Sequence, residues 1–198
     1  MIAARPAPGR VRVIGGEWRR RWLPVPPDDS VRPTADRVRE TLFNWLAPVL
    51  PGARCLDLFA GSGVLGIEAV SRGAAHATLV DVAPAQIARL RASIELLAAG
   101  SRIEVVHADA RRLLAAAPPN PYDIVFVDPP YASGLAPGVL PLLGACWIAA
   151  GALIYVEQAR SEPPIAPPEG WRMMREGATR QSRYALVRAP DGQAPVRS

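Results

Sequence analysis

Short apolar runs alternate with stretches of helical pattern from residue 53 onward. We expect strands at Arg54–Phe59, Ala77–Asp81, Ile103–His107, Asp123–Val127 and Ala152–Glu157. We expect helices at Val64–Arg72, Pro84–Ala99, Arg111–Ala116 and Leu135–Ala149. This alternation predicts an α/β fold, in which a doubly wound, mostly parallel sheet is covered by helices on both faces. An antiparallel hairpin that closes the sheet is predicted from Trp171–Glu176 and Arg183–Arg188.

The first fifty residues carry a different pattern. Val11–Ile14 and Trp18–Leu23 flank Gly15–Gly16, which predicts a β-hairpin with a glycine turn and arginines on both arms. Asp36–Leu46 has an apolar stripe at helical spacing and predicts a helix. The chain is therefore predicted to have two parts, a basic extension and a larger domain: residues 1–50 and residues 51–198.

Charge is distributed unevenly along the chain, whose formal net charge is +5. Residues 1–40 hold nine arginines and five acids, residues 170–198 hold six and two, and the middle holds eight and eleven. An acidic centre between basic ends indicates a site for a cationic small molecule beside a surface that meets a polyanion. Solvated basic tails give the same distribution, so both interpretations stay open at this point.

Composition excludes several classes of protein. The chain has no apolar run of membrane length and no apolar signal core near its start, so we expect a cytoplasmic protein with no membrane partner. Its two cysteines, Cys55 and Cys146, lie in apolar stretches and are expected to be buried thiols. No cysteine or histidine spacing matches a zinc site, so we expect no metal. A chain of 198 residues can bury its own core, and we expect a monomer.

The first candidate site is the run from Asp57 to Gly63, which follows the first expected strand. Its glycines let the backbone pass close beneath a ligand, where a Cβ would collide with it. Gly61 to Gly66 also matches the G-x-G-x-x-G pattern of dinucleotide-binding proteins, so an NAD(P)-dependent oxidoreductase is an alternative. Asp57 favours another ligand, because an acid repels a pyrophosphate but attracts the ammonium and sulfonium groups of S-adenosylmethionine.

Two further acids follow the next two expected strands. Asp81 is placed to accept hydrogen bonds from both ribose hydroxyls, and Asp109, with the Ala110 N–H, to contact the adenine. Either acid could instead cap the helix that follows it. The residues assigned to the cofactor are Asp57, Phe59, Ala60, Gly61, Ser62, Gly63, Asp81, Asp109 and Ala110.

The run Asp128-Pro129-Pro130-Tyr131 directly follows the fourth expected strand. The exocyclic amine of a base is a weak nucleophile, because its lone pair is delocalised into the ring. The Asp128 carboxylate and the Pro129 carbonyl can accept its N–H bonds, while two prolines fix the turn and offer no competing donor. Tyr131 can stack on the base. We therefore predict methyl transfer to a base amine, with these four residues as the catalytic group acting by positioning and electrostatics.

Asp57–Gly63 together with Asp128–Tyr131 resembles the class I Rossmann-fold methyltransferases that modify amino nitrogens. A more specific resemblance is carried by Arg12–Gly16, Leu23–Pro26, Arg32–Thr34 and Asp36–Leu46. These runs are similar to the RsmD family of bacterial 16S ribosomal RNA guanine-N2 methyltransferases. The resemblance implies a Rossmann-like sheet, S-adenosylmethionine as the cofactor, and methylation of one guanine of 16S ribosomal RNA in the small ribosomal subunit or its assembly intermediate. The base chemistry alone leaves an adenine amino group in DNA as an alternative target.

The basic extension then becomes a candidate RNA-binding surface, because arginines can bind phosphates while interleaved tryptophans stack on bases. The residues assigned to RNA are Arg10, Arg12, Trp18, Arg19, Arg20, Arg21, Arg32, Arg37 and Arg39. A structural flap whose tryptophans cover the sheet is the alternative for the hairpin, and Arg32, Arg37 and Arg39 could face the cofactor instead. Glu157, at the end of the fifth expected strand, either lines the pocket or is a surface acid.

Overall fold

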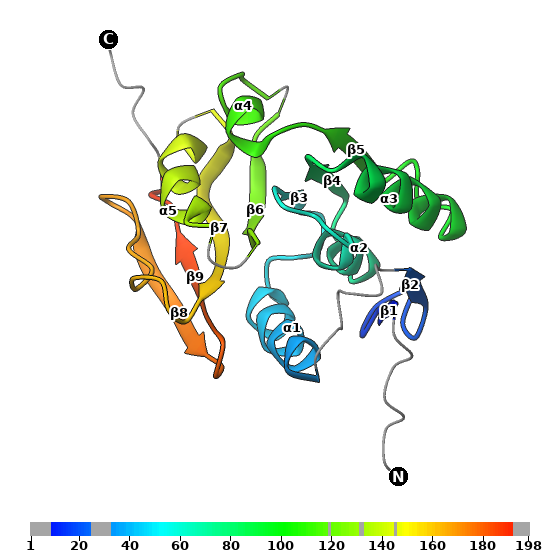
Figure 1. Cartoon of the computed structure of the whole chain (residues 1–198). Helices are drawn as coiled ribbons and strands as arrows, with labels where there is room; N and C mark the ends of the chain where they lie inside the picture. Colours follow the sequence, from blue (N-terminus) through cyan, green and yellow to red (C-terminus); the bar gives the residue numbers. More distant parts are fainter. Residues whose placement is uncertain (1–8, 25–32, 119, 131–132, 145, 192–198) are drawn as a thin grey trace.

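The structure is a computed structural model that describes residues 9–24, 33–118, 120–130, 133–144 and 146–191. Within these residues, seven strands form one sheet in the order β5-β4-β3-β6-β7-β9-β8 (Figure 1). They are Arg54–Asp57 (β3), His76–Asp81 (β4), Ile103–His107 (β5), Tyr122–Val127 (β6), Ile148–Ala159 (β7), Arg172–Ala178 (β8) and Ser182–Arg188 (β9). Strands β3 to β7 are parallel, and β9 is antiparallel to both β7 and β8. The predicted α/β sheet and its closing hairpin are confirmed.

Helices cover both faces of this sheet (Figure 1). They are Pro33–Leu46 (α1), Val64–Ser71 (α2), Pro84–Leu96 (α3), Ala110–Leu114 (α4), Leu135–Val139 (α5) and a 3-10 helix at Leu140–Leu143. Apolar side chains of α1, α2 and α3 form one core with the sheet, and those of α4, α5 and the 3-10 helix form a second core with its other face. No helix in the described part of the chain has both the length and the apolar character needed to cross a bilayer.

β6 at the centre of the sheet shows why the strands are continuous apolar runs. Ile124 and Phe126 pack into the core on the α1 side, whereas Val125 and Val127 pack into the core on the α5 side. Successive side chains of a strand point to opposite faces, so a strand covered on both sides needs an apolar residue at every position. The apolar run ends where Asp128 begins, at the carboxyl edge of the sheet.

The N-terminal extension is a hairpin, but its strands differ from the predicted ones. β1 (Arg10–Arg12) pairs antiparallel with β2 (Trp22–Pro24). The predicted hairpin is confirmed, but Gly15–Gly16 alone do not form its turn, because the residues between the two strands form a longer loop that packs on α2. A Cβ at Gly16 would lie 1.8 Å from the Ser71 carbonyl oxygen, so the loop comes too close to the helix for a larger residue.

The helix predicted over Leu135–Ala149 is also wrong in its second half. It ends as α5 at Val139 and continues only as the short 3-10 helix, which has Pro141 in its first turn. A proline there removes a backbone donor, which limits the length of a regular helix. β7 then begins at Ile148 and pairs with both β6 and β9, so it is longer than the predicted strand Ala152–Glu157.

Two smaller predictions are corrected as well. α1 begins at Pro33, earlier than the predicted Asp36, which is consistent with the tolerance of proline in a first helical turn. Cys55 is a buried thiol as expected, but Cys146 is exposed, because the segment around it lies between the 3-10 helix and β7 rather than inside a helix.

Candidate active site

A cavity of about 660 Å³ lies at the carboxyl ends of β3, β4, β5 and β6. Parallel strands bring their carboxyl ends to one edge of the sheet, where doubly wound folds bind their ligands. Four acids from four different strand ends line this cavity: Asp57, Asp81, Asp109 and Asp128. The residues assigned to the cofactor all line it, with the exception of Gly63. The structure therefore brings together side chains that are far apart in the sequence.

Gly63 has a role behind the cavity wall. It precedes α2 with a φ of 75°, a left-handed conformation that favours glycine. A Cβ at Gly63 would lie 2.5 Å from Leu90 Cδ2, so the packing of Leu90 on α3 would have to shift for a larger residue at this position. This glycine shapes the loop that lines the cavity without lining it itself.

Asp57 is a buried acid with an unsatisfied oxygen, and it is only 2% exposed. Its Oδ2 accepts a hydrogen bond from the Gly66 N–H at 3.3 Å, whereas Oδ1 has no hydrogen-bond donor among the described residues. Burial raises the pKa of Asp57 to about 7, an effect that the nearby Gly66 and Phe59 backbone N–H groups partly offset. A cationic ligand group stabilises the ionised form of such an acid, so Asp57 suits an ammonium group.

The Asp81 carboxylate is held by hydrogen bonds from the loop that follows β3 and from the backbone that follows β4. Its Oδ2 accepts a hydrogen bond from the Gly61 N–H at 2.8 Å, and its Oδ1 accepts one from the Ala83 N–H at 2.8 Å. Each carboxylate oxygen has a second lone pair, so the same group can accept hydrogen bonds from ligand hydroxyls. Asp81 therefore presents a fixed pair of acceptors to the cavity.

Asp109 is the N-cap of α4, because its Oδ1 accepts a hydrogen bond from the Arg112 N–H at 3.0 Å. The capping role considered for Asp109 in the sequence is thus confirmed. Asp109 and Ala110 also line the cavity, so capping fixes the carboxylate at its rim.

Asp128 forms the corner of the cavity together with Pro129 and Pro130. Burial raises the pKa of Asp128 well above its usual range, and the neighbouring acids Glu157 and Asp57 raise it further. Neither proline has an N–H group, so the corner offers hydrogen-bond acceptors to a ligand without competing donors from these two residues. A ligand that donates hydrogen bonds, or that carries positive charge, is the natural partner of this corner.

Comparison with known proteins identifies the family. A family model described as Conserved hypothetical protein 95 matches residues 11–188. Ribosomal RNA small subunit methyltransferase D of Escherichia coli (strain K12) is 48% identical over 179 residues, which cover 90% of this chain and 89% of that protein. The chain belongs to the RsmD family. The protein of the same name from Haemophilus influenzae is 41% identical over 185 residues, covering 91% of this chain and 94% of that protein.

A solved structure supports the same assignment. The structure of yhhF from Escherichia coli matches this RsmD-family chain with a TM-score of 0.83 and 46% identity, over 93% of this chain and 100% of that one. The predicted family and the predicted methyltransferase fold are both confirmed.

The basic extension of this RsmD-family chain presents several arginines to solvent. The exposed members of the predicted RNA-binding set are Arg10, Arg12, Arg19, Arg20, Arg21 and Arg37. The Arg12 guanidinium carbon lies 5.9 Å from the centroid of the Trp22 ring, and Trp22 is 39% exposed. Two other predicted site residues, Arg32 and Tyr131, lie outside the described residues.

Trp18 and Arg39 belong to the packing of the extension and not to its surface. Trp18 is 5% exposed, and the Arg102 guanidinium carbon lies 4.9 Å from its ring centroid. Arg39 is also 5% exposed and donates hydrogen bonds to Asp36 at 2.5 Å and to Glu68 at 3.1 Å. Both residues are therefore buried in the protein and do not belong to the exposed surface predicted to bind RNA. The burial of Trp18 supports the alternative of a structural flap whose tryptophan covers the core.

Glu68 on α2 organises this packing, and the sequence analysis did not single it out. Its side chain has no exposed surface and accepts hydrogen bonds from Arg39 Nη1 at 3.1 Å and from Arg72 Nε and Nη2 at 2.9 and 2.7 Å. The Ile14 N–H of the extension also donates to it, at 3.3 Å. A single acid within the apolar helix Val64–Ser71 was the available signal, because a buried acid needs paired charges.

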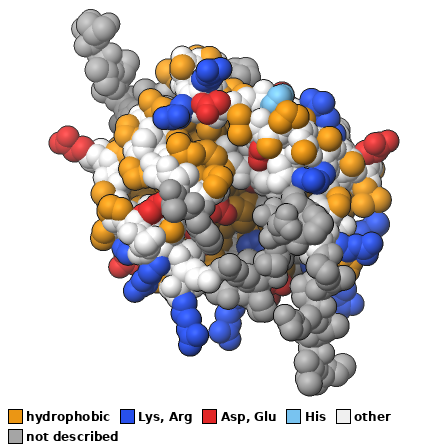
Figure 2. Space-filling view, viewed as in Figure 1, with side chains coloured by type: hydrophobic (Ala, Val, Ile, Leu, Met, Phe, Trp, Pro, Cys, Tyr) orange, Lys and Arg blue, Asp and Glu red, His pale blue; other side chains and the backbone are white. Residues whose placement is uncertain are grey.

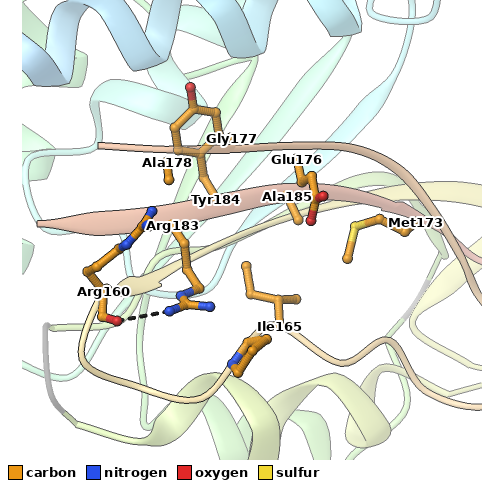
Figure 3. A pocket seen from close by; sticks show the side chains of 10 residues that line it. Arg160, Ile165, Met173, Glu176, Gly177, Ala178, Arg183, Tyr184 and Ala185 are labelled. Carbon is orange, nitrogen blue, oxygen red and sulfur yellow. Dashed lines mark hydrogen bonds between the residues drawn. The ribbon is translucent and has the colours of Figure 1, made fainter. Parts of the chain in front are cut away.

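A second cavity of about 400 Å³ lies between the β8–β9 hairpin and the segment that follows β7 (Figure 3). Arg160 and Arg183 line it, and Arg183 Nη2 donates to the Arg160 carbonyl at 2.9 Å, the dashed line in Figure 3. Ile165 and Met173 give it an apolar wall, with Glu176 as its acid. The residues that line this cavity come together only when the β8–β9 hairpin packs on the segment after β7, so no local sequence pattern predicts the cavity.

Proposed function

We propose that this chain is an S-adenosylmethionine-dependent methyltransferase that methylates the exocyclic 2-amino group of one guanine in 16S ribosomal RNA. The observation that carries the proposal is the acid-lined cavity that ends at the Asp128–Pro130 corner, in a chain of the RsmD family. We infer that the RNA is bound within the small ribosomal subunit or an assembly intermediate. The oxidoreductase considered for the glycine pattern is not kept, because the family and the unsatisfied acid at Asp57 both disfavour a pyrophosphate ligand.

The described residues fit S-adenosylmethionine. The unsatisfied Oδ1 of Asp57 accepts a hydrogen bond from the ammonium group of its methionine part. Asp81, oriented by the Gly61 and Ala83 N–H groups, accepts hydrogen bonds from the ribose hydroxyls, and Asp109 accepts one from the adenine amino group. When bound, S-adenosylmethionine supplies a methyl group activated by a positively charged sulfur.

The Asp128–Pro130 corner acts on the base. The Asp128 carboxylate and the Pro129 carbonyl accept hydrogen bonds from the 2-amino group, which holds the amine in one orientation and draws electron density toward its nitrogen. In its ionised form, which a cationic ligand favours, Asp128 also stabilises the positive charge that develops on this nitrogen. The nitrogen lone pair bonds the methyl carbon as the carbon–sulfur bond breaks, and the nitrogen then loses one N–H proton to water. Tyr131, the fourth member of the predicted catalytic group, lies outside the described residues. No covalent link between protein and RNA is needed in this mechanism.

The RNA backbone is bound by the exposed arginines of the extension. Figure 2 shows basic side chains along the margin of the molecule where β1 and β2 lie in Figure 1. We assign Arg10, Arg12, Arg19, Arg20 and Arg21 to phosphate contacts because they are exposed on or beside the hairpin. The exposed Arg37 on α1 extends this surface. The second cavity adds two guanidinium groups on an apolar wall, a combination that suits a phosphate and a base of the same strand.

The direct test is methyl transfer to small ribosomal subunits isolated from a strain that lacks the enzyme. With S-adenosylmethionine labelled in its methyl group, we expect about one label per particle, recovered as N2-methylguanosine after digestion to nucleosides. Subunits from a strain that has the enzyme are the matched control and should accept almost no label. Label on adenine or cytosine contradicts the base assignment, and transfer to duplex DNA instead of the particle supports the alternative of a DNA adenine methyltransferase.

A further inference from the structure

Glu157 stands beside Asp128 on the next strand of the sheet. In the register of β6 and β7, Val127 pairs with Val156, so Asp128 and Glu157 follow as neighbours at a strand spacing of about 4.8 Å. Alternation along β7 places Glu157 on the same face as Tyr155, two residues earlier, whose ring packs into the core on the α1 side. Asp57 lies on this face too, because β3 pairs Asp57 with Phe126. Three acids therefore occupy one face of three adjacent strands.

The order of these strands fixes where the target base lies. The described residues that line the cofactor cavity come from the ends of β3, β4, β5 and β6, from the loops that follow them and from helices α2 to α5, and β7 contributes none of them. The cofactor therefore lies on the β3 side of Asp128. A base whose amine contacts Asp128 while facing the cofactor must occupy the other side, next to β7. The acid that it meets there is Glu157.

The edge of guanine that carries the 2-amino group also carries a second donor, the N1–H. Adenine and cytosine have a lone pair at the corresponding ring nitrogen, so a carboxylate facing this position attracts guanine and repels the other two bases. We propose that Glu157 is a specificity-determining residue that accepts a hydrogen bond from the N1–H of the target guanine. This inference rests on the proposed function and adds to it the group that recognises the base.

The Glu157 carboxylate is held in place by its own strand. Tyr155 donates its hydroxyl hydrogen to Glu157 Oε2 at 2.6 Å. A carboxylate has about four acceptor positions, so this bond and others can coexist with a bond to the base. The short link to a fully packed tyrosine fixes the direction in which the carboxylate faces, which a selective contact with one ring nitrogen requires.

The test compares two bases that share the 2-amino group but differ at N1 and at position 6, and the Glu157 variants below separate the two differences. The methylated position is first mapped. 16S ribosomal RNA is then ligated from pieces so that this position carries either guanosine or 2,6-diaminopurine riboside, and each RNA is assembled into particles. The diaminopurine keeps the amine but has a lone pair at N1. Loss of a hydrogen bond to a charged group lowers kcat/KM by about 10- to 100-fold when the bond is present in the transition state. The wild-type protein should therefore prefer guanosine in kcat/KM by at least about tenfold.

Substitutions then assign this preference to Glu157. Glu157→Ala should lower kcat/KM on guanosine particles by about 10- to 100-fold and reduce the guanosine preference at least about tenfold. Glu157→Gln, which keeps the shape but can donate an amide N–H to the N1 lone pair, should shift the preference toward diaminopurine. Tyr155→Phe removes the hydroxyl that orients the carboxylate and should reduce the guanosine preference by less than Glu157→Ala does. Glu95→Gln, a change at an exposed acid on α3, is the matched control and should retain the preference.

The outcomes separate this inference from the function on which it rests. If wild-type protein methylates both particles equally well, or if Glu157→Ala slows both by the same factor, Glu157 has only a structural role and the inference is wrong. If wild-type protein transfers no methyl group to guanosine N2, the proposed function fails and the inference fails with it. Unchanged affinity for S-adenosylhomocysteine shows that each variant is folded.

Discussion

The titration of Asp57 makes cofactor binding depend on pH. Burial raises the pKa of this carboxyl to about 7 in the protein without ligand. The ammonium group of the ligand favours the ionised form, so binding below pH 7 must first release a proton from Asp57. Because the raised pKa belongs to the free protein, affinity falls as the pH falls through 7 and is constant well above it. We expect this for S-adenosylhomocysteine, which keeps the ammonium group and lacks the sulfonium charge.

The size of the effect follows from the pKa. A single acid with a pKa of about 7 is about one-tenth ionised at pH 6 and about nine-tenths ionised at pH 8. The dissociation constant of S-adenosylhomocysteine should therefore be about ten times larger at pH 6 than at pH 8. About one proton should be released for each ligand bound at pH 6, and almost none at pH 8. S-adenosylhomocysteine lacks the methyl group that the proposal places beside Asp128, so the ionisation of Asp128 contributes less to the pH dependence of its binding.

Isothermal titration calorimetry in two buffers of different ionisation enthalpy measures both quantities at once. Asp57→Asn removes the titrating group and keeps its shape, so its affinity should be lower and nearly independent of pH. Glu95→Gln, a change at an exposed acid on α3, is the matched control and should behave as wild type. An affinity that does not change between pH 6 and pH 8, with no proton released, would refute the assignment of Asp57 to the ammonium group.

Three further predictions address the corner, the extension and the packing between them. Asp128→Ala should leave the affinity for S-adenosylhomocysteine within about threefold of wild type and lower turnover at least about a hundredfold, in the particle assay described above. Replacing Arg19, Arg20 and Arg21 together by glutamine should weaken binding to the particle, measured by filter binding. The slope of log affinity against log salt concentration should fall in magnitude by about one unit for each phosphate that is no longer bound. Glu68→Ala leaves buried guanidinium groups without their acid and should lower the free energy of unfolding by about 3–5 kcal/mol, measured by urea titration.

The sheet and the cofactor cavity could be predicted because their signals are local. Strands buried on both faces are continuous apolar runs, and a parallel sheet places whatever follows each strand at one edge. Asp57 and Asp81 end their strands, Asp128 directly follows β6, and Asp109 follows β5 after one residue, so their meeting in space follows from the order of the elements. The second half of the predicted helix at Leu135–Ala149 is wrong because Ile148 pairs with Tyr122 of β6 and so extends β7 backward, which no local pattern records.

The surface of the extension was harder to predict, because burial of a basic or aromatic residue depends on distant partners. Arg39 meets Glu68, which is 29 positions away, and Trp18 donates its backbone N–H to Ser71, 53 positions away. Ser71 is not marked in the sequence as a docking point, since serine is common on helices. Glu68 is marked as the single acid of an apolar helix, but this signal does not show which residue pairs with it. The arginines at positions 19–21, which the sequence assigns to RNA, are exposed, and their exposure likewise depends on where the folded core lies rather than on their neighbours in the sequence.

Helix α2 links the two halves of the proposed reaction. Its first residue follows the glycine loop of the cofactor cavity, and its last turn is hydrogen-bonded to the extension. Ser71 Oγ donates to the Gly15 carbonyl at 2.7 Å, and the Ser71 carbonyl accepts from the Glu17 N–H at 2.7 Å. An α-helix of this length is about 12 Å long and stiff. The arginines assigned to RNA are thereby held at a fixed distance from the loop assigned to the methyl donor. A rigid spacer of this kind lets phosphate contacts, which carry no sequence information, place one particular nucleotide at the Asp128 corner.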